Sequence, residues 1–418
     1  MSEHVASEVS PGLIPVAAGA VPADTGPPPD DDSALTQLRI ARAGLLRVAE
    51  PAAPLLAHFV AERGPLEAWR RICAGATPTG VGRLVAARTN NRDPQDLHRL
   101  AVSDLRQAQV VGARLVIPED DEWPEATMIA FAMVDGGARP APLGLYVRGG
   151  RLPEDHRGVV TVIGSRACTA YGRRCAMELS GQLAAAGCLV VSGAAFGIDA
   201  AAHRGAIGAA GPSATLAVLA CGIDRAYPTA NRELLEEIAA GGGAVVTEYP
   251  PGTTPARHRF LIRNRLIAAF GAVTVVVEAG RRSGTISTAN VAQELNRVVM
   301  AVPGPVTSAM SMGCHVLLRR EGVLLAADAK DVLEMLGKHD LSVRPAVPGR
   351  PTDGLAGDAA KVYEALPGRG TRTVWELAEE SGVPGGDVMI ALAELELIEL
   401  ATRQGAQWRR AAGGIRFS

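Results

Sequence analysis

The stretch VVTVIGSRACTAYG, Val159–Gly172, contains the pattern that decides the fold. Its apolar and β-branched beginning favours a buried strand. The turn Gly164-Ser165-Arg166 follows, and a helical pattern begins a few residues later. A strand, a glycine-containing turn and a helix in this order open a nucleotide-binding βαβ unit. The usual G-x-G-x-x-G is missing, however, and Arg166 stands in a turn that normally offers backbone amides to a phosphate.

Further strand-like runs follow this unit, with helical patterns between them. In chain order they are CLVVSG, ATLAVLACG, AVVTEYP, AVTVVVEAG, RVVMAVPG and VLLAA. Near-continuous apolar strands that alternate with helices are typical of a parallel sheet covered on both faces. We therefore predict an α/β fold, a Rossmann-like, doubly wound, mostly parallel sheet over residues 158–337.

Smaller parts flank this domain. Residues 1–32 are rich in Pro, Ala and Asp, which predicts a disordered tail. Residues 33–91 show helical spacing and are predicted to form a SAM-like or helix-hairpin-helix-like module. Residues 92–157 are predicted to connect it to the sheet through short strands in RLVIP and LGLYV, and residues 338–357 to form a linker.

The last part, residues 358–411, is predicted to be a winged helix, because three short helices and a strand pair follow one another. Thr373 and Glu376 have the spacing of a capping box, and Gly382 is placed to end that helix. The next helix and its exit, GDVMIALAELELIEL, carry four acids and no basic residue. A helix that reads DNA needs basic or amide side chains, so we expect this unit to dock a protein or a partner subunit.

The motif TPTGVG, Thr77–Gly82, joins two helical patterns in the first module. It resembles the hairpin of helix-hairpin-helix modules, in which glycine amides approach a phosphate. A helix C-cap is the alternative interpretation.

Composition indicates an ordinary cytoplasmic protein. The chain has 418 residues, 47% hydrophobic content and a net charge of −2, and no apolar run is long enough to span a membrane. The start lacks the basic segment of a secretory signal. The six cysteines form no C-x-x-C pair and are expected to be free thiols. Between Pro251 and Met300, seven arginines face two acids.

The predicted site lies at the carboxyl ends of the strands, where ligands of such sheets bind. Several loops that end in Gly or Ser, interleaved with arginines, indicate a groove for a row of phosphates, and Phe260 and Tyr227 offer flat faces to bases. The candidate residues are Gly164, Ser165, Arg166, Ser192, Gly193, Tyr227, Arg257, Phe260, Arg263, Asn264, Arg265, Ser283, Gly284 and Thr285.

These candidates have structural alternatives. Arg263, Asn264 and Arg265 would also suit a solvated helix face, and Phe260 would suit the core. Asp199 and His203 are spaced like a pair of metal ligands, but a helix cap and a local hydrogen bond explain them better.

The sequence also offers no catalytic group. Glu278 is either a general base or the partner of an arginine. Ser165, Ser192 and Cys221 lack a neighbouring His that would make them nucleophiles. We predict no catalytic residue, no metal and no cofactor.

The ordered motifs VIGSR…YG, VVSGAAFGIDAAAH, LACGIDRAYP, TEYPPG, RFLIRNRLIA, VVEAGRRSGTISTA and AVPGPV resemble the DNA-processing protein A family, also called DprA or Smf. The resemblance extends from Val159 to about Asp328. It implies a non-enzymatic protein that binds single-stranded DNA, passes it to the recombinase RecA in natural transformation, and forms homodimers.

The family's motifs map onto the candidate residues, with some departures. G-S-R corresponds to Gly164–Arg166, the basic residue and aromatic to Arg257 and Phe260, R-N-R to Arg263–Arg265, and S-G-T to Ser283–Thr285. The departures are Phe196 in place of an arginine, Leu261 and Ile262 in place of Pro and a basic residue, Thr229 in place of lysine, and Cys314–His315 in place of C-N.

Two other functions remain open at this point. A nucleotide-binding or nucleoside-phosphate-hydrolysing Rossmann enzyme would use similar glycine-rich loops, although its P-G-G-x-G-T motif is incomplete here. A scaffold that binds only proteins is the third possibility, and the row of arginines argues against it.

Overall fold

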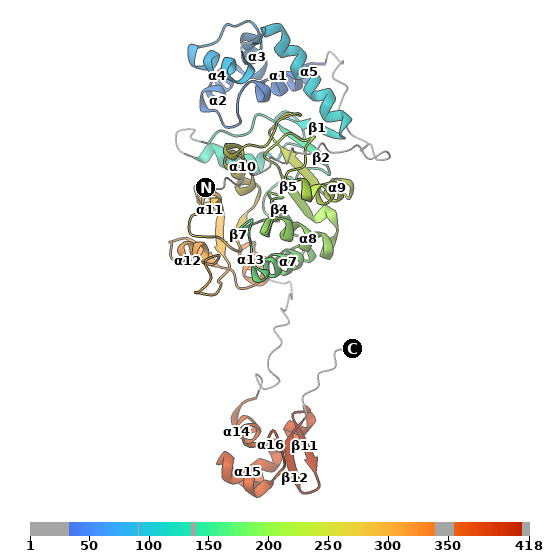
Figure 1. Cartoon of the computed structure of the whole chain (residues 1–418), viewed down its shortest axis with the longest axis vertical. Helices are drawn as coiled ribbons and strands as arrows, with labels where there is room; N and C mark the ends of the chain where they lie inside the picture. The colour runs from blue at the N-terminus through green and yellow to red at the C-terminus, as the bar shows by residue number, and fades with distance from the viewer. Residues whose placement is uncertain (1–32, 91, 135–138, 339–354, 412–418) are drawn as a thin grey trace, which may run out of the picture. The chain divides into compact units, whose positions relative to one another are not determined.

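The computed structural model describes residues 33–90, 92–134, 139–338 and 355–411. The chain divides into two compact units, residues 1–343 and residues 344–418 (Figure 1). The tail predicted for residues 1–32 lies outside the described residues, as does most of the linker predicted at 338–357.

The first unit contains a nine-stranded sheet. Its order is β1-β2-β6-β5-β4-β3-β7-β8-β9. The strands are β1 (Ala113–Val116), β2 (Leu145–Gly149), β3 (Val159–Ile163), β4 (Leu189–Ser192), β5 (Thr215–Val218), β6 (Ala244–Thr247), β7 (Val273–Val276), β8 (Val298–Ala301) and β9 (Val323–Leu325). Strands β3 to β9 are parallel, and β1 and β2 add an antiparallel edge. The predicted fold class and all of the predicted strand runs are confirmed.

The strand order reverses beside β3. The chain proceeds from β3 outward to β6, then returns to pair β7 with the other side of β3. This reversal is the topological switch point, at which doubly wound sheets bind their ligands.

Helices cover both faces of the sheet. They are α6 (Glu125–Met128), α7 (Ala170–Ala185), α8 (Ile198–Ala210), α9 (Arg232–Ala240), α10 (Arg257–Phe270), α11 (Gly284–Glu294), α12 (Met312–Leu318) and α13 (Ala329–Met335), with 3₁₀ turns η1 (Ile129–Met133), η3 (Pro212–Ala214) and η4 (Thr229–Asn231). Because side chains alternate along a strand, Val160 and Val162 of β3 pack with α7, α8 and α13. On the other face, the Thr161 hydroxyl donates to the carbonyl of Ile267 in α10, at 2.7 Å.

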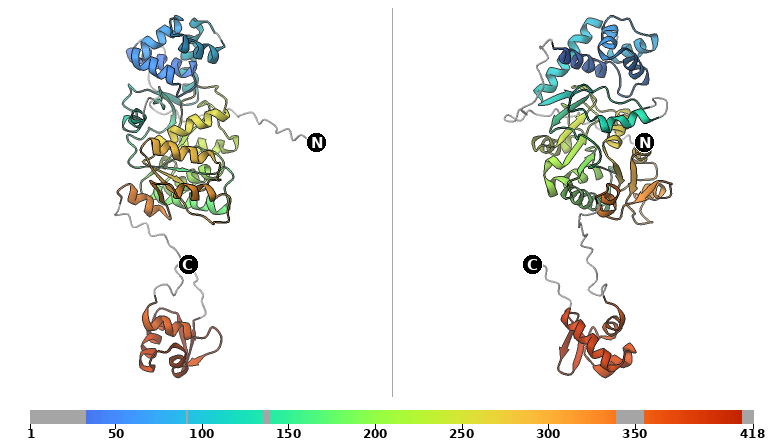
Figure 2. Two further views of the ribbon diagram at one scale, coloured as in Figure 1. Left: turned by 90° about the vertical axis from the view of Figure 1, so that its left-hand side faces the viewer. Right: turned by 180° about the vertical axis from the view of Figure 1, so that it is seen from behind.

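Five helices form the module before the sheet (blue to cyan in Figures 1 and 2). They are α1 (Ala34–Val48), α2 (Pro54–Arg63), α3 (Pro65–Cys73), α4 (Thr79–Thr89) and α5 (Pro94–Val110). The fifth helix lies in the segment predicted to be only a connection, and it buries Leu97, Ala101 and Leu105 against the module. The segment predicted to connect the module to the sheet thus begins with a helix that packs with the module.

The motif TPTGVG lies at the start of α4, whose N-cap is Pro78. The C-cap interpretation is wrong, because α3 ends earlier, at Cys73, with Ala74 as its C-cap. The helix-hairpin-helix interpretation stays a prediction.

The second unit contains three helices and a small antiparallel sheet of order β10-β12-β11. Its elements are α14 (Gly357–Ala365), β10 (Arg372–Thr373), α15 (Val374–Ser381), α16 (Gly385–Leu397), β11 (Ala401–Gln404) and β12 (Gln407–Arg410). The predicted capping box is confirmed at Thr373 and Glu376, and Gly382 ends α15 with φ +69°. The winged-helix assignment stays a prediction.

Candidate nucleic-acid interface

A groove of about 740 Å³ lies at the switch point, where β3 and β7 end. Its walls come from the turn after β3, one face of α10 and the first turn of α11. The predicted residues that line it are Gly164, Ser165, Arg166, Tyr227, Arg257, Phe260, Arg263, Asn264, Ser283, Gly284 and Thr285. The structure thus brings together residues that lie more than a hundred positions apart in the sequence.

Helix periodicity explains why α10 forms a wall of the groove. Its lining residues include Arg257, Phe260, Leu261, Asn264 and Ile267. These positions follow the i, i+3, i+4, i+7 spacing that places side chains on one helix face.

An aromatic and cationic cluster forms one side of the groove. The rings of Tyr227 and Phe260 lie 5.4 Å apart between centroids. The guanidinium of Arg166 lies 4.6 Å from the Phe260 centroid, which is within the range of a cation–π contact. Arg166 is exposed and Phe260 half-buried, so the cluster presents both charge and a ring face to solvent.

The Gly-Ser-Arg turn uses backbone amides to hold its own shape. The Ser165 amide donates to the carbonyl of Glu278 at 2.7 Å, and the Ala167 amide donates to the Ser165 hydroxyl oxygen at 3.2 Å. Those two amides are therefore occupied, and the exposed Arg166 side chain is the group that this turn offers to an anion.

The first turn of α11 supplies a second place for an anion. Ser283 is its N-cap and accepts a hydrogen bond from the Thr285 amide at 3.2 Å. Gly284 is exposed at the first helical position and lines the groove. The amides and the dipole at a helix N-terminus favour negative charge.

Arg263 lies beneath the groove and serves the fold as well. Only 4% of it is exposed, and its Nη1 donates to the carbonyls of Gly193 and Val218, at 2.8 and 2.5 Å. Burial lowers the pKa of Arg263 to about 10, although the Asp199 carboxylate opposes this shift. Arg263 remains a cation at neutral pH and ties the ends of two strands to α10.

Arg265 does not reach the groove, which corrects the prediction for this residue. It is 2% exposed, and its Nη2 donates to the Glu248 carboxylate at 2.5 Å. Its guanidinium also lies 5.0 Å from the Phe131 ring centroid. A side chain enclosed in this way cannot contact a phosphate in the groove.

Ser192 and Gly193 also lie away from the lining. Ser192 is fully buried and donates to the Val162 carbonyl at 2.7 Å. Gly193 packs so closely under Arg263 that a Cβ atom there would lie 2.3 Å from the guanidinium. Both residues support the groove from below.

The candidate acid and histidine residues are used within the fold. Glu278 accepts from the amide and the hydroxyl of Thr169, at 2.8 and 2.6 Å, and so ties the loop before α7 to the end of β7. Neither alternative predicted for Glu278 describes this contact. Burial raises the pKa of Asp199, against the opposing charge of Arg263. His203 contacts the Thr215 hydroxyl of β5 at 2.7 Å, a partner twelve positions along the chain and not the local one expected. The N-cap of α8 is Gly197, so the helix cap expected at Asp199 is wrong.

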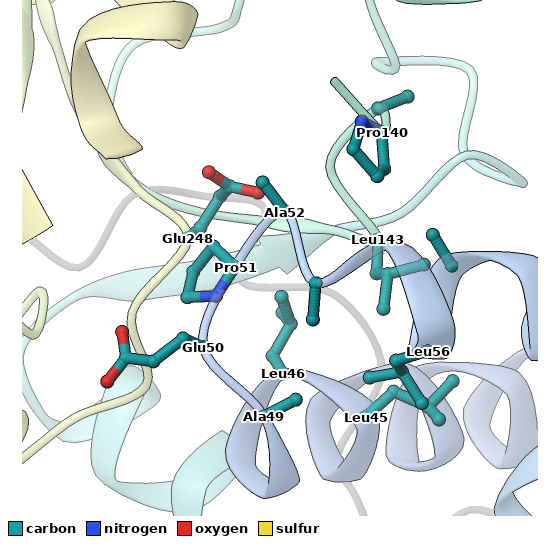
Figure 3. Close-up of a pocket in the computed structure, with 13 residues that line it drawn as sticks. Leu45, Leu46, Ala49, Glu50, Pro51, Ala52, Leu56, Pro140, Leu143 and Glu248 are labelled. Carbon is teal, nitrogen blue, oxygen red and sulfur yellow. The ribbon is translucent and has the colours of Figure 1, made fainter. Parts of the chain in front are cut away.

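Another pocket, of about 20 Å³, lies between the helical module and the sheet domain (Figure 3). It holds about one water molecule, far less than a ligand needs. The leucines of α1 line it, and its two acids, Glu50 and Glu248, form ion pairs with Arg259 and Arg265. This pocket is a small packing defect where the helical module contacts the sheet domain.

Within the described ranges, no three His, Cys, Asp or Glu side chains gather closely enough to hold a metal ion. No helix among the described residues has the length and apolarity needed to cross a membrane. The six cysteines are free thiols, as predicted.

Some residues at the groove were not predicted. Ala195, Leu261 and Thr288 line it. The i+4 spacing from Arg257 to Leu261 would have identified Leu261, whereas Ala195 and Thr288 carry no chemical signal in the sequence.

Comparison with known proteins identifies the family. Residues 114–337 match the family model of DNA recombination-mediator protein A. The DNA processing protein DprA of Mycobacterium tuberculosis is 46% identical over 377 residues, which cover 88% of this chain and 94% of the relative. Protein Smf of Escherichia coli is 34% identical, over 68% of this chain and 73% of the relative. The crystal structure of DprA from Streptococcus pneumoniae superposes with a TM-score of 0.52 at 28% identity, over 71% of this chain and 97% of that one. The chain belongs to the DNA recombination-mediator protein A family, the DprA and Smf proteins.

Proposed function

We propose that this protein binds single-stranded DNA in the groove at the switch point. The observation that carries the proposal is the cluster of Arg166, Phe260 and Tyr227, in which an exposed cation lies against aromatic rings. Single-strand binders combine cations that follow the backbone with aromatic faces on which bases stack. Phosphates contact Arg166, Arg257 and the first turn of α11, and bases stack on Phe260 or Tyr227.

The biological role follows from the family. We propose that the protein acts in the cytoplasm as a homodimer and delivers the bound strand to the recombinase RecA, in transformation or in recombination. It acts without catalysis, because Asp199, which lines the groove, and Glu278, which follows β7, are buried and held by the fold.

A comparison of single-stranded with duplex DNA tests the proposal, because bases can stack on a side chain only when they are unpaired. Fluorescence anisotropy with a labelled oligothymidylate of about 20 nucleotides and a duplex of equal length measures both affinities. We expect the single strand to bind at least about tenfold more tightly, with little dependence on base sequence. Phe260→Leu should remove most of this preference.

Two results would contradict the proposal. Equal affinity for the duplex would indicate a surface that contacts only the backbone. Equally tight binding of a thymidine mononucleotide, measured by competition, would favour a nucleotide-binding enzyme.

A further inference from the structure

An exposed aromatic residue lies directly beside the groove. Phe196, in the loop between β4 and α8, is 50% exposed. Ala195, its neighbour in the chain, lines the groove, and adjacent Cα atoms are only about 3.8 Å apart. Phe196 borders a hollow of about 170 Å³, which Arg173 of α7 and Arg204 of α8 also line.

The loop that carries Phe196 is held in a fixed conformation. Ala194 has φ +52°, a region that costs a non-glycine residue about 1 kcal/mol. The Asn231 side-chain amide donates to the carbonyls of Ala194 and Ala195, at 2.9 and 3.2 Å. Gly197 has φ +77°, and a Cβ atom there would lie 2.3 Å from the Ser165 carbonyl oxygen. Phe196 is thereby fixed next to the turn that carries Arg166.

The charges around Phe196 suit a polyanion. Arg173 and Arg204 are exposed, and in the described part of the chain neither forms an ion pair. The nearby acid Glu178 is already paired with Arg174, at 2.7 Å. An exposed ring and two arginines without ion pairs line the same hollow, so it offers a face to a base and charge to phosphates, as Phe260 and Arg166 do in the groove.

We propose that a single strand bound in the groove continues past Ala195 and stacks a further base on Phe196, with flanking phosphates against Arg173 and Arg204. This inference rests on the proposed function and extends its footprint. A protein could also dock on an exposed phenylalanine, but continuity with the groove and the two unpaired arginines favour nucleic acid.

Binding of short and long strands distinguishes the site at Phe196 from the groove, because only a long strand can reach both. The probes are labelled oligothymidylates of about 5 and about 20 nucleotides, within and beyond the length that one such site covers. We expect Phe196→Leu to weaken binding of the longer strand about 5- to 150-fold, the effect of losing one stacked base. Arg204→Ala should also weaken it, and neither change should affect the shorter strand.

Matched variants identify stacking as the cause. Phe196→Trp keeps a ring and should retain wild-type affinity, whereas Phe196→Leu keeps an apolar side chain without the ring. Arg157→Ala removes an exposed arginine just before β3, at the amino end of the strand whose carboxyl end lies at the groove, and should leave both affinities unchanged. Thermal unfolding of each variant verifies that it is folded.

The outcomes distinguish the two proposals. If Arg166→Ala weakens both strands while Phe196→Leu and Arg204→Ala bind the longer strand like wild type, the second site is refuted and the groove stands. If Phe196→Leu and Phe196→Trp weaken binding of the longer strand equally, stacking on Phe196 is also refuted. If Arg166→Ala does not weaken the shorter strand, the proposed function itself fails.

Discussion

The arginines of α10 show how differently one residue type is used along a single helix. Arg257 is exposed at the groove, Arg259 pairs with Glu50, and Arg263 binds strand-end carbonyls. Arg265 pairs with Glu248 in the interior. Successive helix residues advance by about 100°, so Arg263 and Arg265 face opposite directions. On a helix, the R-N-R spacing therefore allows only one of these two arginines to face the groove, and the prediction of both did not apply this geometry.

Replacement of Arg265 tests its assignment to the fold. Arg265→Ala leaves the Glu248 carboxylate buried without its cation, and we expect the free energy of unfolding to fall by about 3–5 kcal/mol. Urea denaturation measures this loss. The exposed Arg257→Ala should change stability by less than about 0.5 kcal/mol. A loss below about 1 kcal/mol in Arg265→Ala would contradict the assignment.

His203 makes stability depend on pH. Thr215 donates to the Val190 carbonyl and so accepts from Nδ1–H of a neutral His203. Burial, together with the charges of Arg263 and Arg204, lowers the pKa of His203 to about 3. The ordinary pKa of histidine is about 6.5. Below that pH His203 takes up a proton in the unfolded chain but not in the folded protein, so the free energy of unfolding decreases as the pH is lowered.

We therefore expect the free energy of unfolding to fall by about 2 kcal/mol because of His203 when the pH is lowered from 7 to 5. Urea denaturation at both pH values measures the loss in wild type and in His203→Asn, which should lack this contribution. His58→Asn, at an exposed histidine, should retain the wild-type pH dependence. The same dependence in His203→Asn would contradict the prediction.

At the scale of elements, the parallel strands could be predicted because both of their faces are buried. Their runs are nearly all apolar, and the turn residues that end them mark the edge where a ligand binds. Helix α5 was missed, although Asp93 caps it ahead of Pro94, and its buried residues follow helical spacing. The amides of the Gly-Ser-Arg turn could not be assigned from sequence, because their acceptors include Glu278, which is distant in the chain.

Helix α16 is the element least suited to DNA. Val388, Leu392 and Leu395 are buried in its own unit, as predicted, whereas Asp387 and Glu394 are exposed. Carboxylates repel a phosphate backbone, and screening over roughly 10 Å in ordinary salt reduces that repulsion without reversing it. This surface suits a protein partner or a second subunit better than DNA.

Removal of the second unit tests this expectation. A chain shortened to end near Val343 should bind a single strand of a few tens of nucleotides within about tenfold of the full chain, a limit of about 1.4 kcal/mol. Fluorescence anisotropy measures both affinities, and size-exclusion chromatography reports the oligomeric state of each. A loss of tenfold or more with the oligomeric state unchanged would place DNA on the second unit.

At the scale of the whole molecule, the helical module and the groove are parts of one unit. Glu50, after α1, accepts from Arg259 of α10 at 2.8 Å. Arg47 donates to both Asp104 of α5 and the Pro251 carbonyl, which precedes α10. These contacts of the module hold α10, the helix that carries Phe260 and Asn264, in position. All residues of the proposed groove lie in this unit.

The central claim is that this groove holds DNA phosphates, and the salt dependence of single-strand affinity tests it most directly. Each phosphate contact releases counterions, so log K falls with log salt with a slope of about −0.7 per contact. We predict that Arg166→Ala and Arg257→Ala each weaken binding and make this slope shallower by about 0.7, while Arg157→Ala matches wild type. Wild-type affinity and slope in both groove variants, with folding intact, would contradict the account.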